Sequence, residues 1–202
     1  AQNKMRVVHH ELYFGALGVA PGWLHRLALE PVQRLWWFGH GIARRQLVVA
    51  TPDRGAGPRT MRILFLTPYF PPETSAAPAR AWHFARALVR AGHSVRVVTG
   101  LPSHPSGIVP PQWRDKAGTL EVVEGIEVQR VWLYATPRKS PLGRLWNHLS
   151  FACTSLPAML AGPRPDVVLV STPPLFHGLS AWCAARWHGA ALVDDCRDDW
   201  PF

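Results

Sequence analysis

The sequence predicts an α/β domain that begins near Met61, with a doubly wound parallel sheet and helices on both faces of that sheet. Two observations lead to this fold class. Short apolar runs recur along the chain from Arg62 onward, and stretches with helical spacing separate most of them. Strands that alternate with helices in this way form βαβ units. The right-handed crossover between parallel strands then distributes the helices over both faces.

The apolar runs are short and nearly continuous, which is typical of strands that are covered on both faces. Four of them are predicted as parallel strands: 62–66, 93–100, 165–171 and 190–196. The stretch "LEVVEGIEVQRVWLY" reads instead as two alternating runs joined at Glu124-Gly125. We expect an antiparallel hairpin there, whose second strand joins the sheet.

Three helices are expected between the strands: Pro78–Arg90, Pro141–Leu160 and Pro174–His188. Proline at the first helical position and glycine just past the end are typical helix boundaries. In the second helix, Pro157 is expected to kink the helix or to end it early. Its predicted apolar face comprises Leu142, Leu145, Trp146, Leu149, Cys153 and Leu156, and we expect this helix to be buried or interfacial.

If the strand order is 3-2-1-4-5, the order reverses between the first strand and "DVVLVS". Ligands of open α/β sheets bind outside the carboxyl ends of the strands at that reversal. The loops expected at this rim are 67–77, 99–107, 172–174 and 197–200.

The first of these loops, "LTPYFPPETSAAPARAW", combines a rigid turn with small residues. Its prolines lower the entropy lost on ordering, and the small residues Ser75, Ala76 and Ala77 allow a ligand to approach the backbone. The following helix N-terminus offers free N–H groups that suit a phosphate or another anion. The alternative is a stiff turn with a purely structural role.

Polar residues end the other strands. His104 lies between two prolines and could donate to a sugar hydroxyl or a phosphate. Ser171 and Thr172 end the "DVVLVS" strand, whereas His177 is predicted to be structural.

In "DDCRDDWPF", carboxylates surround Arg197, which would keep a neighbouring carboxylate ionised. Such a carboxylate can act as a general base toward an acceptor hydroxyl. The alternative is that Asp195 and Arg197 only pair and brace the strand end.

Composition limits the classes of function. Net charge is +9 and no Lys/Arg-rich block of five or more residues occurs, so a basic surface for anionic lipid or nucleotide phosphates is favoured over nucleic acid. The 3 cysteines are widely spaced, which argues against a disulfide framework or a zinc site and favours a reducing cytosol. No metal-ligand spacing and no G-x-S-x-G motif occur, so neither a metal nor a serine nucleophile is expected.

Residues 1–60 differ from the rest of the chain. No repeating apolar face survives in them beyond two turns, so we expect an extension that is non-native or weakly ordered, with Met61 as the natural start. The alternative is a basic amphipathic anchor around Leu24–Arg45. The ends at Ala1 and Phe202 suggest a fragment.

Several motifs, in order, resemble a known family. "MRILFLTPYFPPETSAAPARAWHFARALVRAGHSVRVVTGLPSHPSG", "VWLYATP", "STPPLFHG" and "DDCRDDWP" are similar to the N-terminal domain of family 4 glycosyltransferases of the GT-B fold. The nearest subgroup is the fucosaminyltransferase-like enzymes that build capsular, exopolysaccharide and O-antigen repeats. The resemblance covers about residues 61–202 and implies a Rossmann-like domain that forms one half of a GT-B fold.

The resemblance implies a retaining transferase that moves a sugar from a nucleotide-sugar, which is a substrate and not a cofactor, to an acceptor that is often lipid-linked. It places the enzyme in the cytoplasm, with peripheral contact to the cytoplasmic membrane face. Carried over by position, Ser75–Ala77 border the cleft and His104 matches the histidine of an "HP" loop. Arg197 and Asp198 match an "RD" pair, which makes Asp198 the candidate polar group at the chemistry.

The chain departs from the family in one important respect. It stops before the second domain, which supplies most donor contacts, so we expect no turnover from residues 61–202 alone. Two other functions stay open: a peripheral membrane-binding module and a GT-B-fold sugar-nucleotide epimerase.

Overall fold

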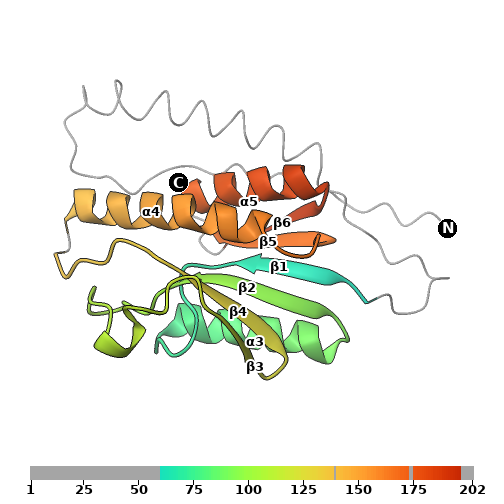
Figure 1. Ribbon diagram of the computed structural model, residues 1–202, viewed down its shortest axis with the longest axis horizontal. Helices are drawn as coiled ribbons and strands as arrows, with labels where there is room; N and C mark the ends of the chain where they lie inside the picture. The colour runs from blue at the N-terminus through green and yellow to red at the C-terminus, as the bar shows by residue number, and fades with distance from the viewer. Residues whose placement is uncertain (1–59, 139, 173–174, 197–202) are drawn as a thin grey trace, which may run out of the picture.

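The protein is described by a computed structural model for residues 60–138, 140–172 and 175–196, and one six-stranded sheet forms its centre (Figure 1). The elements in chain order are β1 (Arg62–Leu66), α3 (Ala76–Arg90), β2 (Ser94–Gly100), η2 (Pro111–Trp113), β3 (Leu120–Val123), β4 (Ile126–Val131), α4 (Pro141–Leu160), β5 (Val167–Thr172), α5 (Leu175–His188) and β6 (Ala191–Cys196).

The strand order is β3-β4-β2-β1-β5-β6. β3 pairs with β4 antiparallel and closes the predicted hairpin, whereas every other pairing is parallel. With β3 left out, the parallel strands follow the predicted 3-2-1-4-5 order. The order therefore reverses between β1 and β5, and the fold class predicted from the sequence is confirmed.

Helices cover both faces of the sheet, α3 on one and α4 with α5 on the other (Figure 1). Successive residues of a strand point to opposite faces of the sheet, so a central strand contributes side chains to two hydrophobic clusters. Leu64 and Leu66 of β1 belong to the cluster under α4 and α5, while Ile63 and Phe65 belong to the cluster under α3. This double burial explains why β1, β2 and β5 read as nearly continuous apolar runs.

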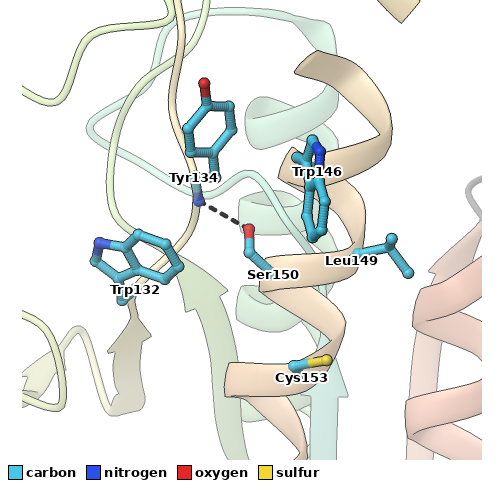
Figure 2. A pocket seen from close by; sticks show the side chains of 6 residues that line it. All are labelled: Trp132, Tyr134, Trp146, Leu149, Ser150 and Cys153. Atoms are coloured by element: carbon cyan, nitrogen blue, oxygen red, sulfur yellow. Dashed lines mark hydrogen bonds between the residues drawn. The ribbon is translucent and has the colours of Figure 1, made fainter. Parts of the chain in front are cut away.

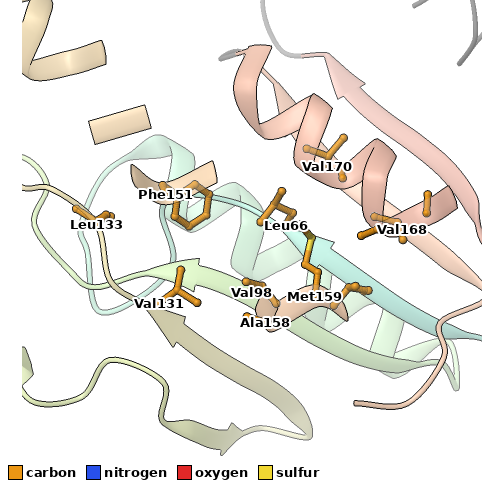
Figure 3. Packing of buried hydrophobic residues seen from close by; sticks show 13 residues of the cluster. Leu66, Val98, Val131, Leu133, Phe151, Ala158, Met159, Val168 and Val170 are labelled. Atoms are coloured by element: carbon orange, nitrogen blue, oxygen red, sulfur yellow. The ribbon is translucent and has the colours of Figure 1, made fainter. Parts of the chain in front are cut away.

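The larger cluster lies between the sheet and α4 and α5. Figure 3 shows Phe151 and Met159 of α4 reaching down to Leu66 of β1 and Val98 of β2. These four side chains are almost completely buried. Removing a methionine or phenylalanine side chain from such a site typically costs about 2–5 kcal/mol.

The first helix begins at Ala76 rather than at the predicted Pro78, with Ser75 at its N-cap. Pro78 therefore lies in the third helical position. A proline fits there because the first turn of a helix has no intrahelical partner for its N–H groups.

α4 runs through Pro157 to Leu160, so the expectation of an early end was wrong. Proline removes only one N–H bond, and the amide of Ala161 still donates to the carbonyl of Pro157 at 3.0 Å. Arg96 of β2 also binds the end of this helix, because its guanidinium donates to the carbonyls of Ala158 and Ala161 at 3.1 and 2.6 Å. A cation at a helix C-terminus offsets the helix dipole.

The sequence also predicted the wrong buried face for α4, because most residues of the predicted face are exposed. Leu142 and Trp146 are 69% and 60% exposed, and Leu145 and Cys153 are exposed as well. The buried residues of this helix are Gly143, Phe151, Ala152, Ser155, Ala158 and Met159. Apolar residues occur on both sides of α4, and the side with small residues packs against α5 and the sheet because it allows the closer approach.

α5 begins at Leu175 within the described residues, and the predicted start at Pro174 lies outside them. It ends at His188, just before Gly189, as predicted. His177 is fully buried and its ring packs edge-on against Phe151 at 4.7 Å, which confirms a structural role. None of the helices that the structure describes combines the length and the hydropathy needed to cross a bilayer.

Candidate functional site

The carboxyl ends of the parallel strands form one rim, and the predicted loops 67–77 and 99–107 lie on it. β1 pairs with β2 on one side and with β5 on the other, so the carboxyl ends of these three strands are neighbours. Residues 173–174 and 197–200 of the other two predicted loops lie outside the described residues. The amide of Thr67 donates to the carbonyl of Val98, and the amide of Gly100 donates to the carbonyl of Pro68. These bonds hold the first two loops against each other directly beyond the sheet.

The first loop leads into α3, where Ser75 is the N-cap and Ala76 and Ala77 are the first helical residues. The Ser75 hydroxyl makes no capping bond to the helix. The amides of Ala76 and Ala77 are therefore not capped by that hydroxyl, and the positive end of the helix dipole faces the rim. Pro78 contributes no N–H, so this helix offers fewer donors than an ordinary N-terminus.

A buried carboxylate joins the first loop to the loop after β2. Oε1 of Glu73 accepts from the amides of Ser103 and His104, both at 2.8 Å. Burial raises the pKa of Glu73, and these amide donors oppose that rise because they stabilise the ionised form. Glu73 thereby fixes the backbone of the His104 loop, and the His104 ring stays exposed beside Tyr69, with 5.1 Å between ring centroids.

Arg130 near the end of β4 completes this buried network. Its side chain is 3% exposed, and Nη2 donates to the carbonyl of Pro71 at 2.6 Å. Nε donates to Glu121 of β3 at 2.9 Å, and the guanidinium lies over the ring of Trp113 at 4.4 Å. Burial lowers the pKa of Arg130, whereas Glu121 opposes that change. The first loop is therefore tied to the loop after β2 by Glu73 and to β4 by Arg130.

On the other side of the reversal, the ends of β5 and β6 carry exposed polar contacts. The Thr172 hydroxyl donates to Asp194 at 2.7 Å, and the Ser171 hydroxyl donates to Asp195 at 3.4 Å. Arg80 of α3 forms an ion pair with Asp195 at 2.5 Å. This pair connects the start of α3 with the end of β6. That the first loop and the whole acidic segment face one crevice stays a prediction, because residues 197–202 lie outside the described residues.

Arg197 and Asp198, the candidate catalytic residues, lie outside the described residues. The predicted pairing of Asp195 with Arg197 therefore stays a prediction, and the partners that the structure gives Asp195 are Arg80 and Ser171. Ser75, Ala76, Ala77, His104 and Thr172 are all described, and all five lie on the rim.

Two grooves lie at the β4 end of the rim, away from the reversal between β1 and β5. One has a volume of about 400 Å³ and is lined by Trp132, Tyr134, Trp146, Leu149, Ser150 and Cys153 (Figure 2). The other, of about 350 Å³, is lined by Trp132, Tyr134, Arg114 and residues 107–109, 133, 135 and 137. Trp132 and Tyr134 line both, so the grooves are continuous with the loop that follows His104.

Sequence reasoning missed Glu73 and Arg130. Arg130 carries a signal, because it follows Ile126 and Val128 at the two-residue period of a buried strand face. A charged residue on that face needs a buried partner. Glu73 carries no comparable signal, since nothing in a proline-rich loop distinguishes a buried carboxylate from an exposed one.

Residues 75–202 match the model of the family described as a glycosyl transferase 4-like domain. The match spans more than half of the chain, and the chain belongs to this family. A search of curated proteins found no match. Among solved structures, the C-terminal domain of a hydrogenase from Pyrococcus furiosus is similar at 15% identity, over 70% of this chain and 96% of that one, with a TM-score of 0.45. We draw no argument from a similarity at that level.

Proposed function

We propose that this chain provides the acceptor side of a glycosyltransferase that transfers a sugar from a nucleotide-sugar to a lipid-linked glycan. Membership of the glycosyl transferase 4-like family over residues 75–202 carries this proposal. The rim supports it, because hydroxyl, imidazole and helix N-terminal N–H groups suit sugar hydroxyls and phosphates. The loops that present these groups are fixed by Glu73 and Arg130.

Three finer features belong to the proposal. The transfer retains the anomeric configuration and takes place at the cytoplasmic face of the membrane, in the synthesis of a cell-surface polysaccharide of the capsular, exopolysaccharide or O-antigen type. A second, donor-side domain completes the nucleotide-sugar site. Residues 61–202 alone therefore do not catalyse the transfer.

The acceptor oxygen bonds to the anomeric carbon, and the bond from that carbon to the nucleoside diphosphate breaks, so that the diphosphate leaves with the electron pair. The acceptor hydroxyl gives its proton to the carboxylate of Asp198. In the proposal Asp198 is the polar group beside the reacting sugar and Arg197 keeps it ionised. Ser75, Ala76, Ala77, His104 and Thr172 contact the substrates from the rim.

The test is a transfer assay on the longest form that the gene encodes, with labelled nucleotide-sugars and a polyprenyl-diphosphate-linked acceptor. Asp198→Asn should lower kcat by about 100-fold or more, the usual range for a group in proton transfer, with donor affinity nearly unchanged. Asp199→Asn is the matched control, because it removes a neighbouring carboxylate of the same strand end. It should retain kcat.

Small and equal effects of the two substitutions would remove Asp198 from the chemistry. A second arm omits the acceptor. Conversion of the nucleotide-sugar without an acceptor would contradict transfer and identify an epimerase instead.

A further inference from the structure

The segment after β4 and helix α4 enclose a concave surface to which the proposed function assigns no role. The two grooves described above, of about 400 and 350 Å³, share Trp132 and Tyr134, and we call them together the aromatic groove. Trp132, Tyr134 and Trp146 are 51%, 42% and 60% exposed. Figure 2 shows Trp132 and Tyr134 on one side of the groove and Trp146 on α4 at the other. Exposed rings around a concavity of about 300–1,000 Å³ are typical of a small-ligand site.

The backbone that carries two of these rings is bonded to α4. Ser150 Oγ accepts from the amide of Tyr134 at 2.8 Å. Asn147 and Thr154 donate to the carbonyls of Tyr134 and Trp132 at 2.7 and 2.5 Å. Because this segment is fixed before a ligand arrives, binding in the aromatic groove loses less conformational entropy.

The charge that lines the aromatic groove has one sign. Arg114 lines its second part, and no carboxylate lines either part among the described residues. No aspartate or glutamate occurs in the sequence between Glu127 and Asp166, which includes the segment after β4 and all of α4. The Nε group of Arg114 donates to the carbonyl of Val109 at 3.5 Å, so the guanidinium is directed along the wall of the groove. A guanidinium in a groove without a carboxylate suits an anionic group of a ligand.

We propose that the aromatic groove binds a sugar unit that carries a negatively charged substituent, such as the carboxylate of a uronic acid. The C–H groups on one face of a sugar ring are weakly positive, and they stack on the negative face of an aromatic ring. Trp132, Tyr134 and Trp146 offer such faces around one groove, and Arg114 meets the anionic substituent. A purely apolar ligand would make no use of that guanidinium.

The aromatic groove adjoins the loop that carries His104. Residues 107–109 line its second part and follow His104 after two residues. The amide of Gly107 donates to the carbonyl of Ser103 at 2.6 Å, which holds this wall of the groove against the loop. When His104 contacts the reacting end of an acceptor glycan, a sugar in the groove is a unit further along the same glycan. The assignment to the acceptor rests on the proposed function, whereas the binding of the sugar does not.

The test is a ligand-observed NMR titration of the full chain with two probes, a hyaluronan tetrasaccharide, which is acidic, and chitotetraose, which is neutral. Trp132→Ala should weaken the binding of both probes by about tenfold, a typical effect for an aromatic anchor of a binding site. Trp132→Phe keeps a ring and should keep most of the affinity. Because Trp132 is half exposed, both variants should keep the fold. Trp187→Ala is the matched control, since Trp187 is 74% exposed at the end of α5, and it should bind as the unaltered chain does.

A charge arm separates the contribution of Arg114 from that of the rings. The unaltered chain should bind the acidic probe about fivefold more tightly than the neutral one, since Arg114 is exposed and its attraction is partly screened. Arg114→Gln should abolish this preference and leave the affinity for the neutral probe unchanged. Arg114→Lys should keep part of the preference. Arg90→Gln removes an equally exposed charge from α3, away from the groove, and should have no effect.

Four outcomes would overturn the inference. The first is that neither probe binds the unaltered chain at millimolar concentration. Binding that survives Trp132→Ala would place the sugar elsewhere. Equal affinities for the two probes that Arg114→Gln leaves equal would remove the anionic substituent from the ligand. Binding of UDP that Trp132→Ala weakens as strongly as it weakens binding of the sugar probes would make the occupant a nucleobase.

A transfer assay on the longest form that the gene encodes connects the aromatic groove with the proposed function. With acceptors of one and of four sugar units, Trp132→Ala should raise KM about tenfold for the longer acceptor only, with kcat and the KM of the donor unchanged. Binding of the sugar probes in the groove without transfer to any acceptor would reject the proposed function alone. Transfer that ignores acceptor length, together with probe binding that ignores Trp132→Ala, would reject this inference alone.

Discussion

The two halves of the rim are connected by polar contacts that differ in burial. Between the loops after β1 and β2, Glu73 and Arg130 are buried and bind main-chain groups. At the ends of β5 and β6, Arg80 and Thr172 bind exposed or half-buried aspartates. Burial makes a lost partner expensive, because water cannot replace it, whereas exposed partners return to solvent. Removal of a contact should therefore destabilise the first half of the rim more than the second.

The largest effect should come from Glu73→Ala. It leaves the amides of Ser103 and His104 without their acceptor, and about 1–3 kcal/mol is lost for each unsatisfied buried group. We expect the free energy of unfolding to fall by about 2–4 kcal/mol, measured by urea denaturation. Glu73→Gln keeps an oxygen for both amides and should lose less than half as much. A loss under about 0.5 kcal/mol in Glu73→Ala would show that the two halves do not differ.

A smaller effect is expected from Gly107→Ala in the loop after β2. Gly107 has a φ of 71°, and a Cβ built on it would lie 2.1 Å from the carbonyl oxygen of Thr136. Gly118→Ala is the matched control, because its φ of 83° imposes the same backbone strain with no atom nearby. The free energy of unfolding should fall by about 1 kcal/mol in Gly118→Ala, and by at least about 1 kcal/mol more in Gly107→Ala. Equal losses in thermal or urea unfolding would mean that this loop can shift away from residue 136.

The smallest effect should come from Arg80→Ala on the exposed half. The side chain of Arg80 is 52% exposed, so its ion pair with Asp195 should contribute less than about 1 kcal/mol. Urea unfolding at low and high salt checks this, since screening should erase the difference. Arg86→Ala, which breaks the exposed pair with Glu124, provides the comparison for a pair away from the rim. If Arg80→Ala lowered the free energy of unfolding by several kcal/mol at every salt concentration, the contacts of the exposed half would stabilise the fold as strongly as those of the buried half.

The elements that the sequence predicts well are those with a single physical explanation. β1, β2 and β5 are nearly continuous apolar runs because both faces of the sheet are covered, and the order considered from the sequence, 3-2-1-4-5, is the order found for the parallel strands. The bounds of α4 were predicted correctly, whereas the face that it buries was predicted wrongly. Its sequence offers two apolar sides, and only the space beside α5 decides that Ala152, Ser155 and Ala158 face inward.

The candidate site was predictable in position and not in its internal contacts. The rule on strand ends located the loops that carry Ser75, His104 and Thr172. It could not supply Glu73, whose role depends on two amides about thirty residues further along the chain. Contacts of this kind arise from loop conformation, which residue patterns do not encode.

The three bonds from Asn147, Ser150 and Thr154 to the segment after β4 have a mechanical consequence. A pull on the ring of Trp132 or Tyr134 is carried directly into the body of α4, because no slack chain separates them. The segment after β4 and α4 should therefore move together and not independently of each other.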